Sequence, residues 1–202
     1  MSGLLDSFTR ADSTSLGTNW TADILGQFYG SFDIVTNAAK VGSGAYDSNW
    51  WNVASFTAAQ DVYATIVTMP TTSFRLYARL ANPGTNSCTG YELEIDTTTS
   101  YIVRLDTAGV RVTLLNLSTV FANGNKAKLE CSGTTLTAYR DTGAGWVSLG
   151  STTDSYYDRV GYIGMLAQNT TALTVDDFGG GAIAPPAPPA GSARRTLMGA
   201  GG

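Results

Sequence analysis

The sequence has no histidine among its 202 residues. This absence excludes Ser-His-Asp and Cys-His nucleophile systems and every metal site that needs an imidazole ligand. An enzyme built on this chain would have to work with carboxylates, tyrosine, lysine or a hard cation. The missing residue type therefore favours binding and assembly over catalysis.

Charge is also scarce, with 14% charged residues and a net charge of −4. The body has no basic stretch, so it lacks the positive face that nucleic-acid binding needs. No apolar run approaches ~20 residues, and we expect no membrane span. Residues 1–6 lack the basic start and apolar core of a signal peptide, so we expect synthesis in a cytoplasm without export by that route.

Cysteine is limited to two positions. Cys131 alternates with Ala127 and Leu129, which predicts a buried apolar side chain. Cys88 falls in an expected loop. A disulfide between the two stays open, because sequence spacing alone does not show that they are close.

The residues that are abundant favour strands. Thr, Ser, Asn and Gly replace charge, and the chain has 10 Tyr and 4 Trp. β-Branched and aromatic side chains fill pleated surfaces, and Gly and Asn supply the positive φ of tight turns. Period-2 alternation dominates from about Val62 onward and little reads as helix, so the fold class is an all-β, antiparallel β-sandwich.

The alternation in residues 74–96 restricts how two strands pair, because facing side chains must share a face. The expected core-facing pairs are Leu80 with Tyr91, Ala78 with Leu93, and Leu76 with Ile95. The expected outward pairs are Arg79 with Glu92, Tyr77 with Glu94, and Arg75 with Asp96. One face would be apolar and the other striped with opposite charges.

Two further strands should extend this meander. We expect Leu105 opposite Leu93 and Val103 opposite Ile95, which brings Arg104 beside Glu94. A turn over residues 106–109, closed by a left-handed glycine, should return the chain. The next strand would place Val112 opposite Leu105 and Leu114 opposite Val103. Hairpins around residues 132–134 and 141–145, and strands near 160–167 and 172–178, should complete the body.

Composition changes abruptly at residues 179–181, a run of three glycines. We therefore predict a sandwich domain over residues 1–179 and a Pro/Gly-rich extended tail over residues 180–202. Near the end of this tail, two cations stand beside two apolar side chains, at Arg194, Arg195, Leu197 and Met198. The alternative is a tail without structure of its own.

Four segments spread over most of the body carry a family resemblance: DSFTRADSTSLGTNW (6–20), GYELEI (90–95), LTAYRDTGAGW (136–146) and VGYIGMLAQNTTALTVDDFGGG (160–181). In their order and spacing they resemble concanavalin A-like or laminin G-like jelly rolls, in particular those of bacteriophage virion proteins. The resemblance is more specific for the fold than for a function, since function belongs to a site and not to a scaffold.

This resemblance implies a non-enzymatic virion structural protein: a capsid decoration, neck or tail component, made in the host cytoplasm and located in the virion. Its partners would be other virion proteins or copies of itself, docked through Arg194, Arg195, Leu197 and Met198, with adhesion to surface glycans as a further role. The alternatives are a carbohydrate-binding module and a family 16-like glycoside hydrolase.

The same family suggests a structural calcium where the first and last strands meet. Asp6, Asp176 and Asp177 are the candidate ligands, because calcium favours several oxygen donors. Turn capping or ordinary surface charge is the competing interpretation. We expect no other cofactor.

Aromatic residues are the candidates for sugar stacking. Trp50 and Trp51, between two asparagines, and Tyr77 on the charged strand could contact a glycan. Trp146 follows a hairpin turn, where we expect it to pack inward.

A glycosidase would use Glu92, Glu94 and Asp96, which alternate along one strand. Family 16 glucanases, which share the fold, carry Glu-x-Asp-x-Glu on one strand, whereas here the residue types are exchanged. A general acid needs a raised pKa, and neighbouring arginines would instead stabilise the ionised carboxylates. We therefore interpret the acids as cross-strand ion pairs.

Overall fold

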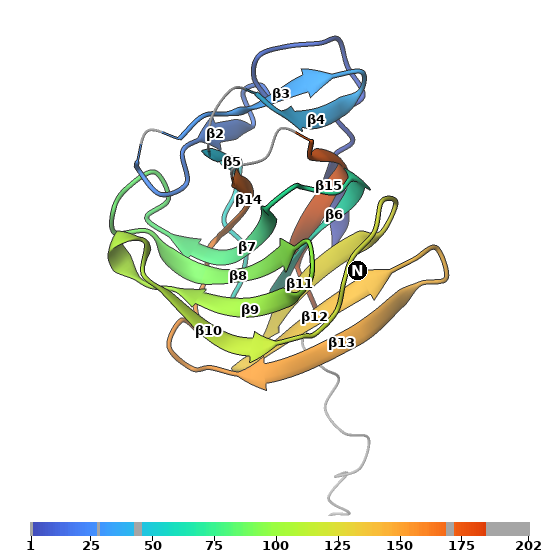
Figure 1. The fold of residues 1–202 in the computed structure, drawn as a ribbon. Coiled ribbons are helices and arrows are strands. Elements are labelled where there is room, and N and C mark those ends of the chain that lie inside the picture. The colour runs from blue at the N-terminus through green and yellow to red at the C-terminus, as the bar shows by residue number, and fades with distance from the viewer. Residues whose placement is uncertain (1, 28, 43–45, 169–171, 185–202) are drawn as a thin grey trace, which may run out of the picture.

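The computed structural model describes residues 2–27, 29–42, 46–168 and 172–184, which form two antiparallel sheets packed face to face (Figure 1). Sheet A runs in the order β13 (Trp146–Thr153), β12 (Thr135–Asp141), β11 (Lys126–Ser132), β6 (Gln60–Thr68), β15 (Thr174–Ala182), β4 (Ala38–Val41) and β3 (Phe32–Val35), with β1 (Gly3–Asp6) paired to β15. Sheet B runs in the order β10 (Arg111–Asn116), β9 (Ser100–Leu105), β8 (Thr89–Asp96), β7 (Ser73–Ala81), β14 (Tyr162–Gln168), β5 (Tyr46–Trp51) and β2 (Trp20–Ala22).

This architecture confirms the antiparallel β-sandwich predicted from the sequence. The predicted turn at residues 106–109 is a short 3-10 helix, η1 (Thr107–Gly109), with Gly109 at φ 73° as expected. Among the described residues, no helix is long and apolar enough to cross a membrane.

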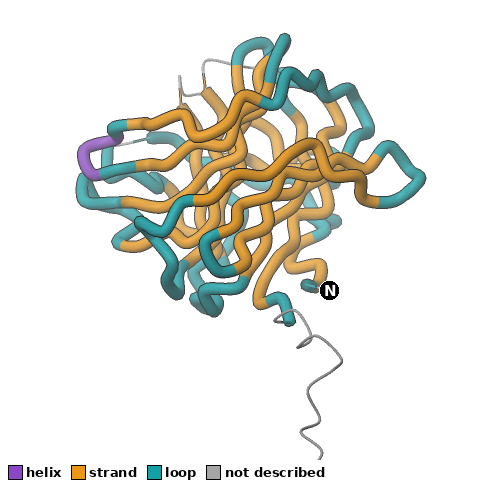
Figure 2. The backbone as a smooth tube through the Cα atoms, turned by 90° about the horizontal axis from the view of Figure 1, so that it is seen from below, coloured by secondary structure: helices purple, strands orange, loops and turns teal. Residues whose placement is uncertain are grey.

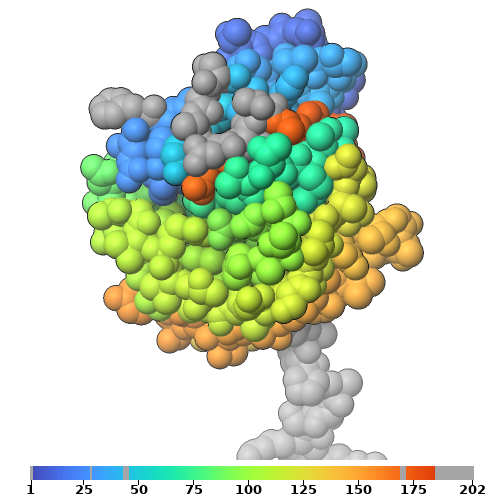
Figure 3. Space-filling view, in the orientation of Figure 1, coloured from blue at the N-terminus to red at the C-terminus, as the bar shows by residue number. Residues whose placement is uncertain are grey.

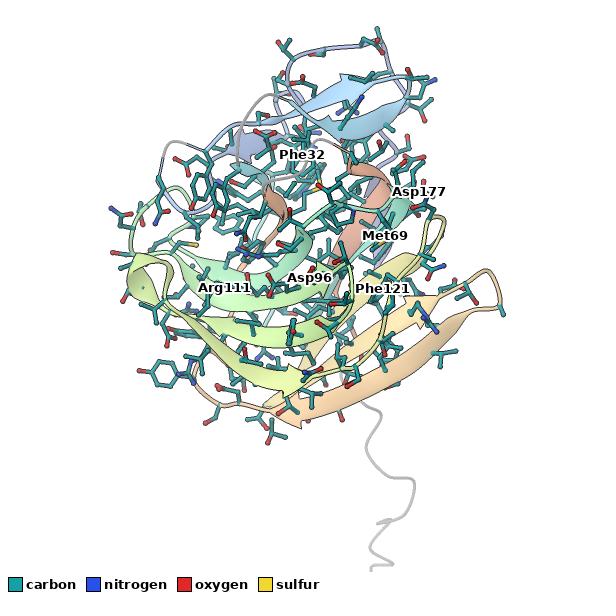
Figure 4. All side chains as sticks on the ribbon, viewed as in Figure 1. Phe32, Met69, Asp96, Arg111, Phe121 and Asp177 are labelled. Carbon is teal, nitrogen blue, oxygen red and sulfur yellow. The ribbon has the colours of Figure 1, made fainter. Side chains whose placement is uncertain are left out.

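A hydrophobic core fills the space between the sheets. Alternate residues of β6 and β11, such as Val62, Ile66 and Leu129, point into it and are fully buried. Phe32 and Phe121, labelled in Figure 4, belong to the same core. Burying a side chain of this size contributes about 1.5–3 kcal/mol, so the core dominates the stability of the sandwich.

The two ends of the sandwich meet, as the resemblance predicted. β1 pairs with β15 in a register that places Gly3 opposite Gly180 and Asp6 opposite Phe178. Figure 2 shows the N-terminus close to the point where β15 ends. The Trp20 ring lies 4.7 Å from that of Phe178 between centroids, which fixes this closure with aromatic packing.

The glycine run that the sequence assigned to the start of the tail is part of β15. Gly179 pairs with Tyr63 of β6, and the strand continues to Ala182. A Cβ on Gly179 would lie 2.2 Å from a ring carbon of Tyr63, so the missing side chain lets this ring lie across the strand. The sandwich therefore extends past residue 179, where we predicted it to end.

The register of β7 and β8 differs from the predicted one by two residues. Leu76 faces Leu93, Arg75 faces Glu94 and Tyr77 faces Glu92. A shift of two keeps residues 74–78 on their predicted faces, because the side-chain period is also two. Alternation therefore gave these faces correctly and left the partners undetermined. Leu80, which we predicted to face the core opposite Tyr91, is instead buried in a cluster with Tyr77 and Leu166.

The pairing of β9 was predicted on the wrong face. Ile102, and not Leu105, lies opposite Leu93, while Val103 pairs with Glu92. On β10, Arg111 rather than Val112 faces Leu105. The β9 sequence is apolar on both faces, so alternation could not choose between them.

A bulge in β7 removes Arg79 from the predicted charge ladder. The register shifts between Ala78 and Ala81, and Arg79 has φ 53°. Its side chain is fully buried and donates to the carbonyl oxygens of Ala58 (2.8 Å) and Gly133 (2.7 Å). The bulge re-aims the side chain toward loops of the sandwich, so Arg79 does not pair with Glu92.

Candidate functional site

The outer face of sheet B, which points away from the core, gathers charged and aromatic side chains from four strands. Cross-strand pairing sets them in rows: Glu92 beside Tyr77, and Glu94 beside Arg75. Gln168 of β14 extends the second half of this surface toward β5. The alternation of β7 and β8 places these polar groups outward because their neighbours Leu76 and Leu93 fill the core.

Arginines neutralise the carboxylates on this face. Arg111, reaching from β10 across β9 to β8 (Figure 4), pairs with Glu92 and with Glu94, the latter at 2.6 Å. Arg75 pairs with Glu94 at 3.2 Å. One planar guanidinium thus bridges two carboxylates, as the fork geometry of arginine allows.

Burial and neighbouring charges both shift the pKa values of Arg75 and Tyr77, which lie below this surface. Burial lowers the pKa of Arg75, but Tyr77, Glu92 and Glu94 raise it above its ordinary value. The pKa of the buried Tyr77 hydroxyl lies well above its ordinary value, mainly through desolvation and then through Glu92. Both groups therefore keep their protons across the physiological range.

Two tyrosines border the charged groups. Tyr29, from the segment before β3, stacks on Tyr46 of β5 with ring centroids 4.8 Å apart and an interplanar angle of 15°. Gln168 donates a hydrogen bond to the Tyr46 hydroxyl at 3.1 Å and accepts one from Arg75. The aromatic pair is therefore held in place by the charged network beside it.

These side chains surround a pocket of about 350 Å³, which we call the sheet B pocket. Arg75, Arg111, Gln168, Tyr29 and Tyr46 line it, together with residues 25, 27, 108 and 109. In Figure 3 the blue segment that precedes β3 lies against the green and yellow-green parts of sheet B. The pocket thus combines hydrogen-bond donors and acceptors with a stacked aromatic pair.

The three carboxylates proposed for a glycosidase are placed differently from a catalytic pair. Glu92 is fully buried and paired with Arg111, while Glu94 meets two arginines. Asp96 accepts a hydrogen bond from the backbone N–H of Thr97 at 2.6 Å. The predicted ion-pair interpretation is right in kind, although the cations are Arg111 and Arg75 and not Arg79 and Arg104.

Of the aromatics predicted to contact a glycan, only Trp50 has an accessible position. Trp51 is buried in the core against Trp20, and Tyr77 is fully buried beneath the outer face. Trp50 is half-buried and packs edge-on against Tyr162. Trp146 was expected to pack inward but lies on the outer face of sheet A, near Tyr63. Two adjacent strand residues must point to opposite faces, so Trp50 and Trp51 could not both be exposed.

The candidate calcium ligands have other partners. Asp6 accepts hydrogen bonds from the Arg10 guanidinium (2.6 Å) and the Trp20 indole N–H (2.8 Å). Asp177 lies 3.6 Å from the Lys126 ammonium. Within the described ranges, no group of three His, Cys, Asp or Glu side chains is arranged to hold a metal ion. For Asp6 the geometry matches the turn-and-charge interpretation instead.

Neither cysteine is disulfide-bonded. Cys131 is fully buried, as predicted, and Cys88 lies in the predicted loop but is also buried. Burial raises the pKa of each thiol to about 12, which keeps both inert as nucleophiles. The predicted docking residues Arg194, Arg195, Leu197 and Met198 lie outside the described residues.

Sequence reasoning missed most of the sheet B pocket. Tyr29 lies in an irregular segment, and Gln168 ends a strand whose partners alternation does not specify. Arg111 was expected on a strand but not opposite Leu105. Only the repeated Arg and Glu positions signalled this face, because charge on alternating strand positions marks a polar surface.

No family model matches this sequence, and neither does any curated protein. Solved structures with similar folds do exist. The carbohydrate-binding module CBM66 from Bacillus subtilis aligns with a TM-score of 0.56 and 16% identity, covering 81% of this chain and 94% of that module. The exoplasmic/lumenal domain of VIP36, bound to Ca²⁺ and Man2, aligns with a TM-score of 0.65 and 12% identity, covering 92% and 89%.

The carbohydrate recognition domain of Emp46p, in its potassium-bound form, is also similar, with a TM-score of 0.63 and 10% identity over 90% of this chain and 97% of that domain. These are concanavalin A-like lectin and carbohydrate-binding folds. At such low identity the likeness establishes the fold, which agrees with the jelly roll expected from the sequence.

Proposed function

We propose that this protein is a non-enzymatic glycan-binding module whose ligand occupies the sheet B pocket. The observation that carries the proposal is the stacked Tyr29–Tyr46 pair beside fixed amide and guanidinium groups. A sugar presents C–H faces that pack on aromatic rings and hydroxyl groups that need both donors and acceptors. The carbohydrate-binding names of similarly folded proteins support the same function.

The ionic network supports binding without hydrolysis. Glu92 pairs with Arg111 and Glu94 pairs with Arg75, whereas a general acid needs its carboxyl group free to give a proton to the leaving group. A glycosidase also needs two carboxyl groups that are free to flank the bond it cleaves. We therefore expect no hydrolysis of β-glucans by the wild type, and hydrolysis that Glu92→Gln abolishes would contradict this.

A glycan array followed by titration calorimetry tests the binding site. We expect Tyr46→Ala to weaken binding of the best array ligand by about tenfold or more, because it removes one stacked ring and the hydroxyl held by Gln168. Tyr46→Phe, which keeps the ring, should lose less. Tyr156→Ala is the matched control, since Tyr156 is 67% exposed and outside the sheet B pocket.

An array without any bound glycan would contradict the proposed function. So would equal binding by the wild type and Tyr46→Ala, because the ligand would then lie elsewhere.

The virion role stays a prediction from the sequence resemblance. The predicted localisation in a virion rests on the same resemblance. The predicted docking residues, Arg194, Arg195, Leu197 and Met198, lie outside the described residues. Deletion of residues 185–202 should then leave a folded, glycan-binding body that no longer incorporates into particles. Normal incorporation of this truncation would end that prediction.

A further inference from the structure

A second pocket lies on the opposite side of the sandwich, on the outer face of sheet A. It measures about 200 Å³ and is formed by β6, β11 and the hairpin between β12 and β13. We call it the sheet A pocket. Its lining residues are Asp61, Tyr63, Lys126, Lys128, Asp141 and Trp146, with Ser2 beside Asp61.

Asp61 is the unusual member of this pocket. The residue is 4% exposed, and its Oδ2 atom accepts a hydrogen bond from the Ser2 hydroxyl at 2.6 Å. Its Oδ1 atom is buried and has no hydrogen-bond partner among the described residues. Burial raises the pKa of this carboxyl group. An unpartnered buried carboxylate oxygen costs folding free energy, so a retained one calls for a donor from outside the chain.

Trp146 supplies an aromatic wall. It meets Tyr63 edge-on, with ring centroids 6.0 Å apart, and the Lys128 ammonium lies 5.0 Å from its ring. Lys128 also lies over the Tyr139 ring at 4.1 Å and pairs with Glu130 at 3.2 Å. These contacts fix the indole in one orientation, which prepares a flat surface for a ligand.

The charges around the pocket select the chemistry of the ligand. A cation would meet Lys126 and Lys128, and an anion would meet Asp61 and Asp141. A neutral ring with several hydroxyl groups avoids both repulsions, because it can donate to a carboxylate and accept from an ammonium group. Its C–H face would pack on Trp146.

We propose that the sheet A pocket is a second binding site that takes a single neutral sugar ring, with Asp61 accepting its hydroxyl protons and Trp146 stacking on its face. This site is separate from the sheet B pocket, because the two lie on opposite outer faces of the sandwich. Its test can therefore fail while the proposed function stands.

Fluorine NMR on the full chain, labelled with fluorotryptophan, tests the second site. The protein has four tryptophans, and loss of one signal in Trp146→Phe assigns the relevant resonance. The probes are the methyl glycosides of mannose, glucose, galactose, fucose and N-acetylglucosamine at millimolar concentration. We expect at least one probe to shift the Trp146 signal in a saturable manner.

Three variants identify the site. Asp61→Asn and Trp146→Ala should weaken this binding at least about tenfold, through loss of the charged acceptor and of the stacking face respectively. Asp61→Asn also shows whether the fold is intact, because we expect its thermal midpoint to be equal to or above that of the wild type. Tyr46→Ala, which alters only the sheet B pocket, should leave the Trp146 shift unchanged.

A Trp146 signal that no probe shifts overturns the proposal. A shift that Tyr46→Ala abolishes and Asp61→Asn leaves intact overturns it as well, since that ligand would occupy the sheet B pocket.

Discussion

On the outer face of sheet B, Glu92 and Glu94 both meet guanidinium groups, whereas on the outer face of sheet A the Asp61 carboxylate accepts its hydrogen bond from the neutral Ser2 hydroxyl. The two faces carry the same classes of side chain. They differ in their cations, because sheet B uses Arg75 and Arg111 and sheet A uses lysines.

That difference has a geometric origin. A guanidinium is planar and has several donors, so Arg111 of β10 pairs with two carboxylates of β8 at once, across the intervening β9. An ammonium group is a point charge, and Lys128 places it between two aromatic rings and Glu130. Arginines therefore pair with the carboxylates at the centre of sheet B, while the lysines of sheet A pair with Asp177 and Glu130 rather than with Asp61.

The largest loss of unfolding free energy should come from substituting Arg79, whose side chain the β7 bulge turns away from the charged outer face of sheet B. Arg79→Met leaves the carbonyl oxygens of Ala58 and Gly133 buried without their donor, and we expect it to lower the free energy of unfolding by about 4 kcal/mol. Urea unfolding monitored by circular dichroism measures this loss. Asp158→Asn is the control, because this partner carboxylate is 39% exposed and should cost less than about 1 kcal/mol. Equal losses would show that the ion pair dominates.

Breaking the sheet B network should have the next largest effect. Arg111→Ala leaves the fully buried Glu92 without its cation and should cost about 3 kcal/mol, measured by the same unfolding experiment. Adding Glu92→Gln should recover part of the loss, since the double variant buries no unpaired charge. If the planar guanidinium geometry matters, the unfolding free energy of Arg111→Lys should lie between those of the wild type and Arg111→Ala. A lysine variant as stable as the wild type would remove the geometric distinction between the faces.

On sheet A we expect a substitution that removes a charge to raise the free energy of unfolding instead of lowering it. Because burial raises the folded-state pKa of Asp61 above its ordinary value of 3.8, ionisation disfavours the folded state as the pH rises through this window. Asp61→Asn should therefore be about 1 kcal/mol more stable than the wild type at pH 7. The difference should shrink as the pH falls through the raised folded-state pKa, and it should level off below 3.8, where the wild-type carboxyl is protonated in both states. Thermal unfolding between pH 3 and pH 8 checks this, and a destabilised variant at neutral pH would mean that Asp61 is satisfied in the folded protein.

The smallest effect should come from Lys128. Lys128→Met keeps the side-chain length but removes the charge above Tyr139 and Trp146, and we expect a loss of about 0.5 kcal/mol in unfolding free energy. A loss as large as that of Arg111→Ala would show that the lysine network is as tightly coupled as the arginine network.

Period-2 alternation by itself determined that the chain forms strands and which side of β6, β7, β8 and β11 faces the core. It could not determine partners, because a two-residue slip of β7 against β8 leaves every face unchanged. It also failed on β9, whose apolar residues fit either face, and it gave no sign of the bulge that turns Arg79 inward.

Both candidate sites depend on contacts across the chain that only the tertiary structure decided. Tyr29 reaches Tyr46 from an irregular segment, and Trp146 reaches Tyr63 across β12 and β11. The amino-acid sequence by itself favoured binding over catalysis, because it has no histidine, oppositely charged residues on alternating strand positions and many aromatic residues. Which aromatics are exposed and which cation meets which carboxylate depend on register and bulges, because these set the neighbours of each side chain and the alternation of a strand does not.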